Sequence, residues 1–201
     1  MSDQMRIPCV IMRSGTSKGI YLLGNDLPED PETRDKVILS IFGSPDSRQI
    51  DGLGGADPLT SKLAIISVSD REDADIDYTF GQVEIKKPYV DYSSNCGNIS
   101  AGVGPFAIQQ GLVRAVEPVT TVRIYNTNTK KVFVAEVPVK NGKPAPVSAS
   151  TWPELSAPRP AACCPPTMQW THWISRALAF CPYPCWMPAV PWCSSGPRTL
   201  A

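Results

Sequence analysis

Three short segments of the chain combine small residues with groups that bind anions or move protons. Residues 13–19 are RSGTSKG, residues 52–62 are GLGGADPLTSK and residues 95–98 are NCGN. Glycines and hydroxyl side chains leave backbone N–H groups accessible, and successive N–H groups bind anions. Lys62 and Cys96 add an amine and a thiol that can take up or release a proton. Together the loops predict a site for a small polycarboxylate, with Lys62 and Cys96 placed for proton transfer.

The first segment shares residues with a phosphate-binding loop but not their order. The GxxxxGK[ST] motif has Lys before the hydroxyl residue and a helix after it. Here Thr16 and Ser17 precede Lys18, and an apolar run typical of a strand follows. The exposed N–H groups would still suit a carboxylate. Taken alone, the segment favours the alternative, a polar hairpin turn with no ligand.

Lys62 stands where the second segment enters the apolar run LAIISVS. A Lys at the start of a strand is usually a solvated charge. The alternative is a partly desolvated amine that acts as a base. The residue pattern alone leaves both open.

Cys96 precedes a stretch, 99–108, in which apolar or small residues occur almost all round. Such a pattern predicts a buried helix rather than an amphipathic one. Cys96 would then lie at the helix N-terminus, where the helix dipole and free N–H groups favour a thiolate or a substrate carboxylate. A small buried thiol is the commoner fate of a lone Cys, but the polar, glycine-rich setting favours a site.

The elements that position these loops are predicted from local signals. Apolar runs at 6–12 and 20–24 predict two strands around the first loop. Asp30 before Pro31 predicts a helix start, and Gly43 ends that helix after about three turns. Further strands are predicted at 63–69, 77–86, 120–126 and 131–138. The order β-β-α-β-β-α-β-β predicts an α+β domain with a sheet wrapped on a central helix.

Bulk composition excludes several classes of protein. The formal net charge is zero, and no Lys/Arg run is interleaved with aromatics, so nucleic acid is not an expected partner. Neither a signal-peptide pattern nor an apolar run of about 18 residues occurs, so we expect no membrane association. Cys9 and Cys96 are the only thiols before residue 151, which is not a disulfide framework. We therefore expect a soluble cytoplasmic protein.

The last quarter of the chain has a different composition. All five Trp, the single His, five of the seven Cys and ten of the 21 Pro lie in residues 151–201. Only four of the 38 charged side chains lie there. The Cys spacings match no regular CxxC pair, so we expect no metal site. With few charges, many Pro and no periodicity, this segment is not expected to form a packed domain.

The motifs MRSGTSKG, DGLGGADPLTSK and NCGNISAGVGPFA resemble the PrpF family, which includes 2-methylaconitate cis-trans isomerases and 4-oxalomesaconate tautomerases. The likeness runs from about residue 6 to about residue 140. It implies a diaminopimelate-epimerase-like fold of two similar domains with the site between them, of which this chain would supply the first. One position departs from the pattern, with Ser14 where the family usually has Gly.

The resemblance implies roles for individual residues. Lys62 would be the principal base that moves an allylic proton, and Cys96 occupies the position of an epimerase catalytic thiol. The reaction would need no cofactor. The residues expected to hold substrate carboxylates are Gly15, Thr16, Ser17, Lys18, Asn95, Gly97 and Asn98. Of the two substrates, the motifs slightly favour 4-oxalomesaconate.

The likeness ends before the compositional change, and the genetic code suggests why. Back-translation of residues 163–174, read one base earlier, permits LLPTxNAVDxLD, which is similar to a segment of the family's second half. Residues 186–193 treated in the same way permit a segment of the form DAGxPxV. We therefore expect a PrpF-like domain at 1–145 and an out-of-frame tail at 146–201, the frame breaking between about 140 and 163.

Three functional hypotheses follow from these observations. The first is a cofactor-independent isomerase or tautomerase of a small unsaturated di- or tricarboxylate, weakened by the absence of the second domain. The second is an inactive fragment, and the third is a small carboxylate-binding module. The oligomeric state stays open, a homo-oligomer included.

Overall fold

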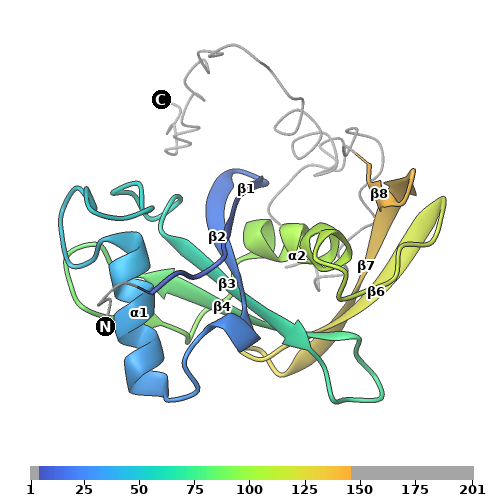
Figure 1. Cartoon of the computed structure of the whole chain (residues 1–201), viewed down its shortest axis with the longest axis horizontal. Coiled ribbons are helices and arrows are strands. Elements are labelled where there is room, and N and C mark those ends of the chain that lie inside the picture. Colours follow the sequence, from blue (N-terminus) through green and yellow to red (C-terminus); the bar gives the residue numbers. More distant parts are fainter. Residues whose placement is uncertain (1–4, 146–201) are drawn as a thin grey trace, which may run out of the picture.

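A computed structural model describes residues 5–145, which form an α+β domain (Figure 1). The helices are α1 (Pro31–Phe42), α2 (Gly97–Gln109) and the short 3-10 helix η1 (Gly24–Asp26). The strands are β1 (Val10–Ser14), β2 (Ser17–Leu23), β3 (Lys62–Val68), β4 (Ile76–Val83), β5 (Val90–Asp91), β6 (Val119–Asn126), β7 (Lys131–Lys140) and β8 (Lys143–Pro144). The expectations for the tail at 146–201 lie outside the described residues.

The strands form one mixed sheet in the order β1-β2-β3-β4-β6-β7-β8, with β5 paired to β4. The pairs β2–β3 and β4–β6 are parallel, and the other neighbours are antiparallel. Each parallel pair is joined by a connection that contains a helix, as parallel pairing requires. The predicted order of strands and helices is confirmed, with η1, β5 and β8 as additions.

Alternating side chains of the sheet divide the core into two layers. Ile20 and Leu22 of β2 face the cluster that contains α1, whereas Tyr21 between them faces the cluster that contains α2. The side-chain period of two in a strand places neighbours on opposite faces. Figure 1 shows α1 and α2 on either side of the strands. The sheet therefore has an α1 face and an α2 face.

Helix α1 begins and ends at the predicted residues. Asp30 is its N-cap, and the Asp30 carboxylate accepts a hydrogen bond of 2.8 Å from the Thr33 N–H. Pro31 follows as the first helical residue, where a missing N–H costs nothing. Gly43 closes the helix in the left-handed conformation with φ 76°. Side chains of Ile38 and Phe42 fill the layer on the α1 face.

Helix α2 is buried on almost every side, as its composition predicts. It touches β1, β2, β3 and β4 at one side of the domain and β7 and β8 at the other, so the sheet curls around it. Gly102 permits the closest approach, since a Cβ there would fall 2.4 Å from the Tyr21 hydroxyl. The sheet wrapped on a central helix is thus confirmed.

The predicted first strand starts too early. The pattern placed it at 6–12, but β1 begins at Val10. Pro8 has no N–H to donate to a ladder. Ile7 instead packs against the cluster on the α1 face. The hairpin therefore consists of five residues of β1 against β2, closed by a two-residue turn at Gly15 and Thr16.

Candidate active site at the N-terminus of the central helix

The tip of the β1–β2 hairpin lies on the N-terminus of α2. Asn98 donates through Nδ2 to the Thr16 hydroxyl at 2.9 Å and to the Ser17 hydroxyl at 3.4 Å. The Ser14 hydroxyl donates to the backbone carbonyl of Asn98. Gly15, with φ 57°, makes the turn between these contacts. The first and third loops predicted from the sequence are therefore brought together.

Ser14 fits this arrangement without backbone strain. Positive φ occurs at Gly15 and not at Ser14. The Ser14 side chain is buried, 4% exposed, and faces α2. Ser14, where the resemblance predicts Gly, thus adds a contact between hairpin and helix.

The first N–H groups of α2 lack a side-chain cap. Cys96 is the N-cap residue and makes no capping hydrogen bond. Within residues 5–145 the space beside Gly97 is open, since outside its own helix backbone and chain neighbours no heavy atom lies within 4 Å of where its Cβ would be. N–H groups at a helix start without a cap are a ready site for a carboxylate, because they donate hydrogen bonds and the dipole favours negative charge. The geometry at Cys96 and Gly97 is therefore that of an anion site.

Two buried polar side chains hold the segment just before Cys96 in place. Asn126, at the end of β6 and 1% exposed, donates through Nδ2 to the Asn95 side chain at 3.0 Å. The Ser100 hydroxyl donates to the Cys96 carbonyl at 3.0 Å. These contacts fix the entry to α2, so the Asn95 oxygen is engaged within the protein while the residue itself stays exposed. Sequence reasoning missed Asn126 and Ser100.

Lys62 is the first residue of β3 and only 8% exposed. Its neighbour in the parallel ladder is Gly19, which lies on the same face of β2 as Ser17 and Tyr21. The Lys62 side chain consequently lies on the α2 face. Ser17 is two residues before Gly19 on β2, so its side chain lies on the same face. Nζ donates to Gln82 Oε1 at 2.8 Å and lies 5.4 Å from the centre of the Phe80 ring. Of the two alternatives, the structure excludes a fully solvated charge.

Lys18 points away from this face. Its Nζ donates to the Leu53 carbonyl at 3.0 Å and its N–H to the Leu59 carbonyl at 2.9 Å. Both acceptors belong to the glycine-rich second loop. Lys18 therefore ties the first loop to the second, and its predicted contact with a carboxylate stays a prediction.

Two buried phenols lie beneath the helix start. Burial raises the pKa of Tyr21 and of Tyr78 far above the usual value for a phenol, and a charge on Cys96 would raise both further. Tyr21 donates its hydroxyl to the Ile99 carbonyl at 2.8 Å. Both groups therefore remain neutral at physiological pH.

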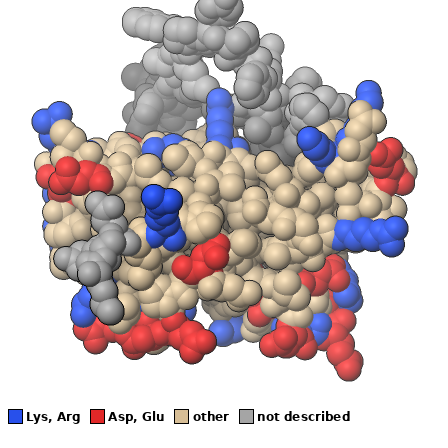
Figure 2. All heavy atoms as spheres, viewed as in Figure 1, with Lys and Arg blue, Asp and Glu red and all other residues tan. Residues whose placement is uncertain are grey.

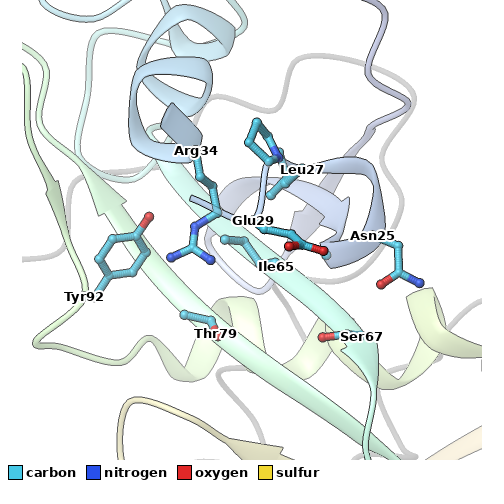
Figure 3. A pocket seen from close by; sticks show the side chains of 10 residues that line it. Asn25, Leu27, Glu29, Arg34, Ile65, Ser67, Thr79 and Tyr92 are labelled. Atoms are coloured by element: carbon cyan, nitrogen blue, oxygen red, sulfur yellow. The ribbon is translucent and has the colours of Figure 1, made fainter. Parts of the chain in front are cut away.

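A cavity in the described part of the chain lies elsewhere, on the α1 face. It has a volume of about 630 Å³ and is lined by Ile65, Ser67, Thr79, Tyr92 and residues near η1 and α1. Figure 3 shows the Arg34 guanidinium pointing into it. The sheet separates this cavity from Lys62 and Cys96, because Ile65 belongs to the layer on the α1 face. It is therefore not part of the candidate site, which is an open surface at the helix start.

Charged side chains are distributed unevenly over the face of the molecule in Figure 2. Figure 2 shows acidic side chains gathered at the lower edge of this face of the molecule, with a largely uncharged centre. Within residues 5–145, no three His, Cys, Asp or Glu residues are grouped as a metal ion would need. In the same range no helix is long and apolar enough to span a membrane.

Fold and site together define an α+β domain with a polar site at the uncapped end of a central buried helix. Residues 4–148 match the family described as PrpF protein, and the chain belongs to that family. The chain is 73% identical over 143 residues to a 3-methylitaconate isomerase of Eubacterium barkeri, covering 71% of this chain and 38% of the relative.

Other relatives carry different names. A 4-oxalomesaconate tautomerase of Pseudomonas putida is 58% identical over 140 residues, covering 70% of this chain and 39% of the relative. A 2-methyl-aconitate isomerase of Cupriavidus necator is 48% identical over 150 residues, which is 70% of this chain and 38% of the relative. The chain thus spans about two fifths of the length of the curated relatives that it matches.

A solved structure supports the fold. A crystal structure of methylitaconate-delta-isomerase matches with a TM-score of 0.70 and 72% sequence identity, covering 71% of this chain and 64% of that chain. The first-domain fold expected from the resemblance is therefore present in the described residues.

Proposed function

We propose that the site performs cofactor-independent proton transfer on a small unsaturated di- or tricarboxylate. The observation that carries the proposal is the desolvated Lys62 on the face of the sheet that meets the uncapped start of α2. A base beside an anion-binding helix end is what removal of a proton from a carboxylate substrate requires.

The proposed reaction balances without an external reactant. Lys62 removes a proton from a carbon next to the activated double bond, and that C–H bond breaks. The electron pair spreads into an enolate, whose charge the first N–H groups of α2 stabilise. A proton then returns at the other end of the allylic system as the double bond moves. It comes from Lys62, or from Cys96, whose thiolate then recovers a proton from the Lys62 ammonium by way of solvent. No atom is gained or lost.

Substrate contacts are assigned to the two loops that meet at Asn98. The open space at Gly97 accepts one carboxylate on the helix N–H groups. The Thr16 and Ser17 hydroxyls and the Gly15 turn contact another part of the substrate, and the exposed Asn95 lies at the edge of the site. Lys18, whose side chain points to the other face, would reach a substrate carboxylate only by leaving the Leu53 carbonyl. These assignments follow the resemblance to the family, and the hydrogen bonds from Asn98 to Thr16 and Ser17 support those that join the hairpin to the helix start.

Three acids are candidates for the substrate. The motifs favour 4-oxalomesaconate, with 2-methylaconitate next. The 73% identity to a 3-methylitaconate isomerase, against 58% and 48% for the other two relatives, adds 3-methylitaconate and makes it the first acid to assay. All three present carboxylates around a carbon skeleton in which a proton moves.

The experiment assays this chain with each acid and follows exchange of substrate protons with deuterated solvent by NMR. Lys62→Ala is expected to abolish exchange, and Cys96→Ala to reduce it at least tenfold. Lys36→Ala and Cys9→Ala are matched controls, because Lys36 pairs on the surface with Glu32 and Cys9 is exposed. Full activity of Lys62→Ala would refute the proposal.

A carboxylate-binding module is the second candidate, favoured by the open helix start at Gly97. Binding by N–H groups does not need a base. Titration with the unreactive dicarboxylate succinate discriminates the two. Under this alternative Lys62→Ala retains most of the affinity and the wild-type chain shows no proton exchange.

A further inference from the structure

Gln82 of β4 lies directly beside Lys62. The two residues are paired in the antiparallel ladder between β3 and β4, so their side chains share the α2 face. Lys62 Nζ donates to Gln82 Oε1 at 2.8 Å. Neither the family resemblance nor the three loop motifs assigns any role to Gln82.

The orientation of the Gln82 amide is fixed by its other half. Nε2 donates to the Ser61 carbonyl at 3.0 Å and to the Pro58 carbonyl at 3.1 Å. A flipped amide would set its oxygen against two carbonyl oxygens and its NH₂ group against an amine. Gln82 can therefore present only an acceptor to Lys62.

The position of this acceptor restricts the direction in which the lone pair of the Lys62 amine can point. When neutral, Lys62 has two N–H bonds and one lone pair. One N–H is committed to Gln82 Oε1, so the lone pair cannot point at Gln82. The Phe80 ring, 5.4 Å from Nζ, borders the amine on the same strand as Gln82.

Gln82 supplies this contact without a negative charge. A carboxylate in the same position would favour the ammonium form and so withhold the base. The neighbours of Lys62 in the sheet are Gly19 on β2 and Gln82 on β4, neither of which is charged, and the Cys96 thiol packs against the core on the same face of the sheet. Asp91 of β5 is paired with Gln82 on the side of β4 that faces away from β3, so Gln82 lies between Lys62 and Asp91. Hydrogen bonds from Ser93 keep the pKa of Asp91 below its usual range, so this carboxylate is ionised at neutral pH.

We infer that Gln82 is the positioning residue for Lys62, a neutral and oriented acceptor that aims the lone pair of the amine at the substrate. This inference rests on the proposed role of Lys62 as the base. It explains why an amide and not a carboxylate separates Lys62 from Asp91, which lies two strand spacings, or about 10 Å, from Lys62.

The test measures the titration of Lys62 itself, by NMR of the chain labelled at lysine side chains and assigned with Lys62→Arg. Gln82→Glu is expected to raise the pH at which Lys62 titrates by about one unit or more. Gln82→Leu removes the acceptor and is expected to lower it. A variant that merely disordered the loop would expose Lys62, and both substitutions would then shift the titration in the same direction.

Activity supplies the second readout. Gln82→Glu is expected to move the rising limb of the pH–rate profile to higher pH by the same amount as the NMR titration, so activity recovers in alkali. Gln82→Leu is expected to lower kcat about tenfold or more with a smaller change in KM. Gln110→Glu is the control, since it adds the same charge at the exposed end of α2 and should change neither readout.

The outcomes separate this inference from the proposed function. Unchanged or parallel titration shifts in the two Gln82 variants would overturn the positioning role. The two variants could shift the titration in opposite directions while the wild-type chain exchanges no substrate protons. That result would confirm the effect of Gln82 on Lys62, and only the proposed isomerase activity would be wrong.

Discussion

Gly15 lies so close to Asn98 that a Cβ on Gly15 would fall 2.3 Å from the Asn98 side-chain oxygen. The hairpin turn and the start of α2 are therefore in contact at a position where only a hydrogen atom fits. Asn98 in turn donates to Thr16 and Ser17. The candidate site depends on this contact, because it sets the distance between the hairpin hydroxyls and the helix N–H groups.

Gly15→Ala is expected to destabilise the domain and to weaken carboxylate binding. The added methyl group meets Asn98, and φ 57° is itself unfavourable for Ala. The two effects together should cost about 2–3 kcal/mol in the free energy of unfolding, measured in urea. Gly142→Ala is the control, since φ is 69° there and nothing in residues 5–145 crowds the added Cβ. It should cost only about 1–2 kcal/mol. If the two substitutions cost the same free energy of unfolding, the Asn98 side chain moves aside for the methyl group without a measurable cost.

Asn98→Asp separates stability from binding. The Thr16 and Ser17 hydroxyls can donate to a carboxylate as well as accept from an amide, and a negative charge in the first turn of a helix is favourable by about 0.3–1 kcal/mol. Stability should therefore hold or rise slightly. A substrate carboxylate meets a like charge, so its dissociation constant should rise about tenfold, measured by calorimetry. Asn141→Asp adds the same charge in an exposed turn and should change neither. Tighter binding by Asn98→Asp would exclude a carboxylate at this place.

Local signals in the sequence were sufficient for most of the fold. The helix from Pro31 to Phe42 follows from its capping Asp30 and its closing Gly43, which act within one turn of the chain. The burial of α2 follows from its composition, and the position of Cys96 follows from where that composition begins.

The partners of the site residues could not be predicted in the same way. Gln82 is one polar residue in an alternating strand, and its contact with Lys62 depends on a register between β3 and β4 that spans 20 residues. Asn126 reaches Asn95 across 31 residues at the end of β6. The direction of the Lys18 side chain likewise depends on which face of β2 meets α2. Such contacts arise from tertiary pairing, which no short motif encodes.

Gly102→Ala should destabilise the domain although Ala is the better helix former. Ala at a helical position is favoured over Gly by about 1 kcal/mol. A Cβ at position 102, however, would fall 2.4 Å from the Tyr21 hydroxyl, which is buried and bonded to Ile99. We expect a net loss of about 1–3 kcal/mol in the free energy of unfolding.

Gly97→Ala in the same helix is the matched comparison for Gly102→Ala. No side chain of the described residues lies within 4 Å of a Cβ at position 97, so stability should be unchanged or improved. The new methyl group enters the open space assigned to a substrate carboxylate, and affinity for the carboxylate should fall. Unchanged affinity would show that the substrate carboxylate does not bind beside Gly97.

Acid stability should depend on Asp75. Hydrogen bonds from the Arg123 side chain and N–H hold the pKa of Asp75 below its usual range. The resulting stabilisation is complete above the unfolded-state pKa of about 3.9 and is lost as the pH falls through the folded-state value. Since the Asp75 side chain is 28% exposed, Asp75→Asn should cost about 1 kcal/mol or less at pH 7, a difference that shrinks below about pH 4. Urea unfolding at several pH values measures it, with exposed Asp51→Asn as control. A difference that persisted unchanged in acid would assign the effect to the shape of the side chain and not to its charge.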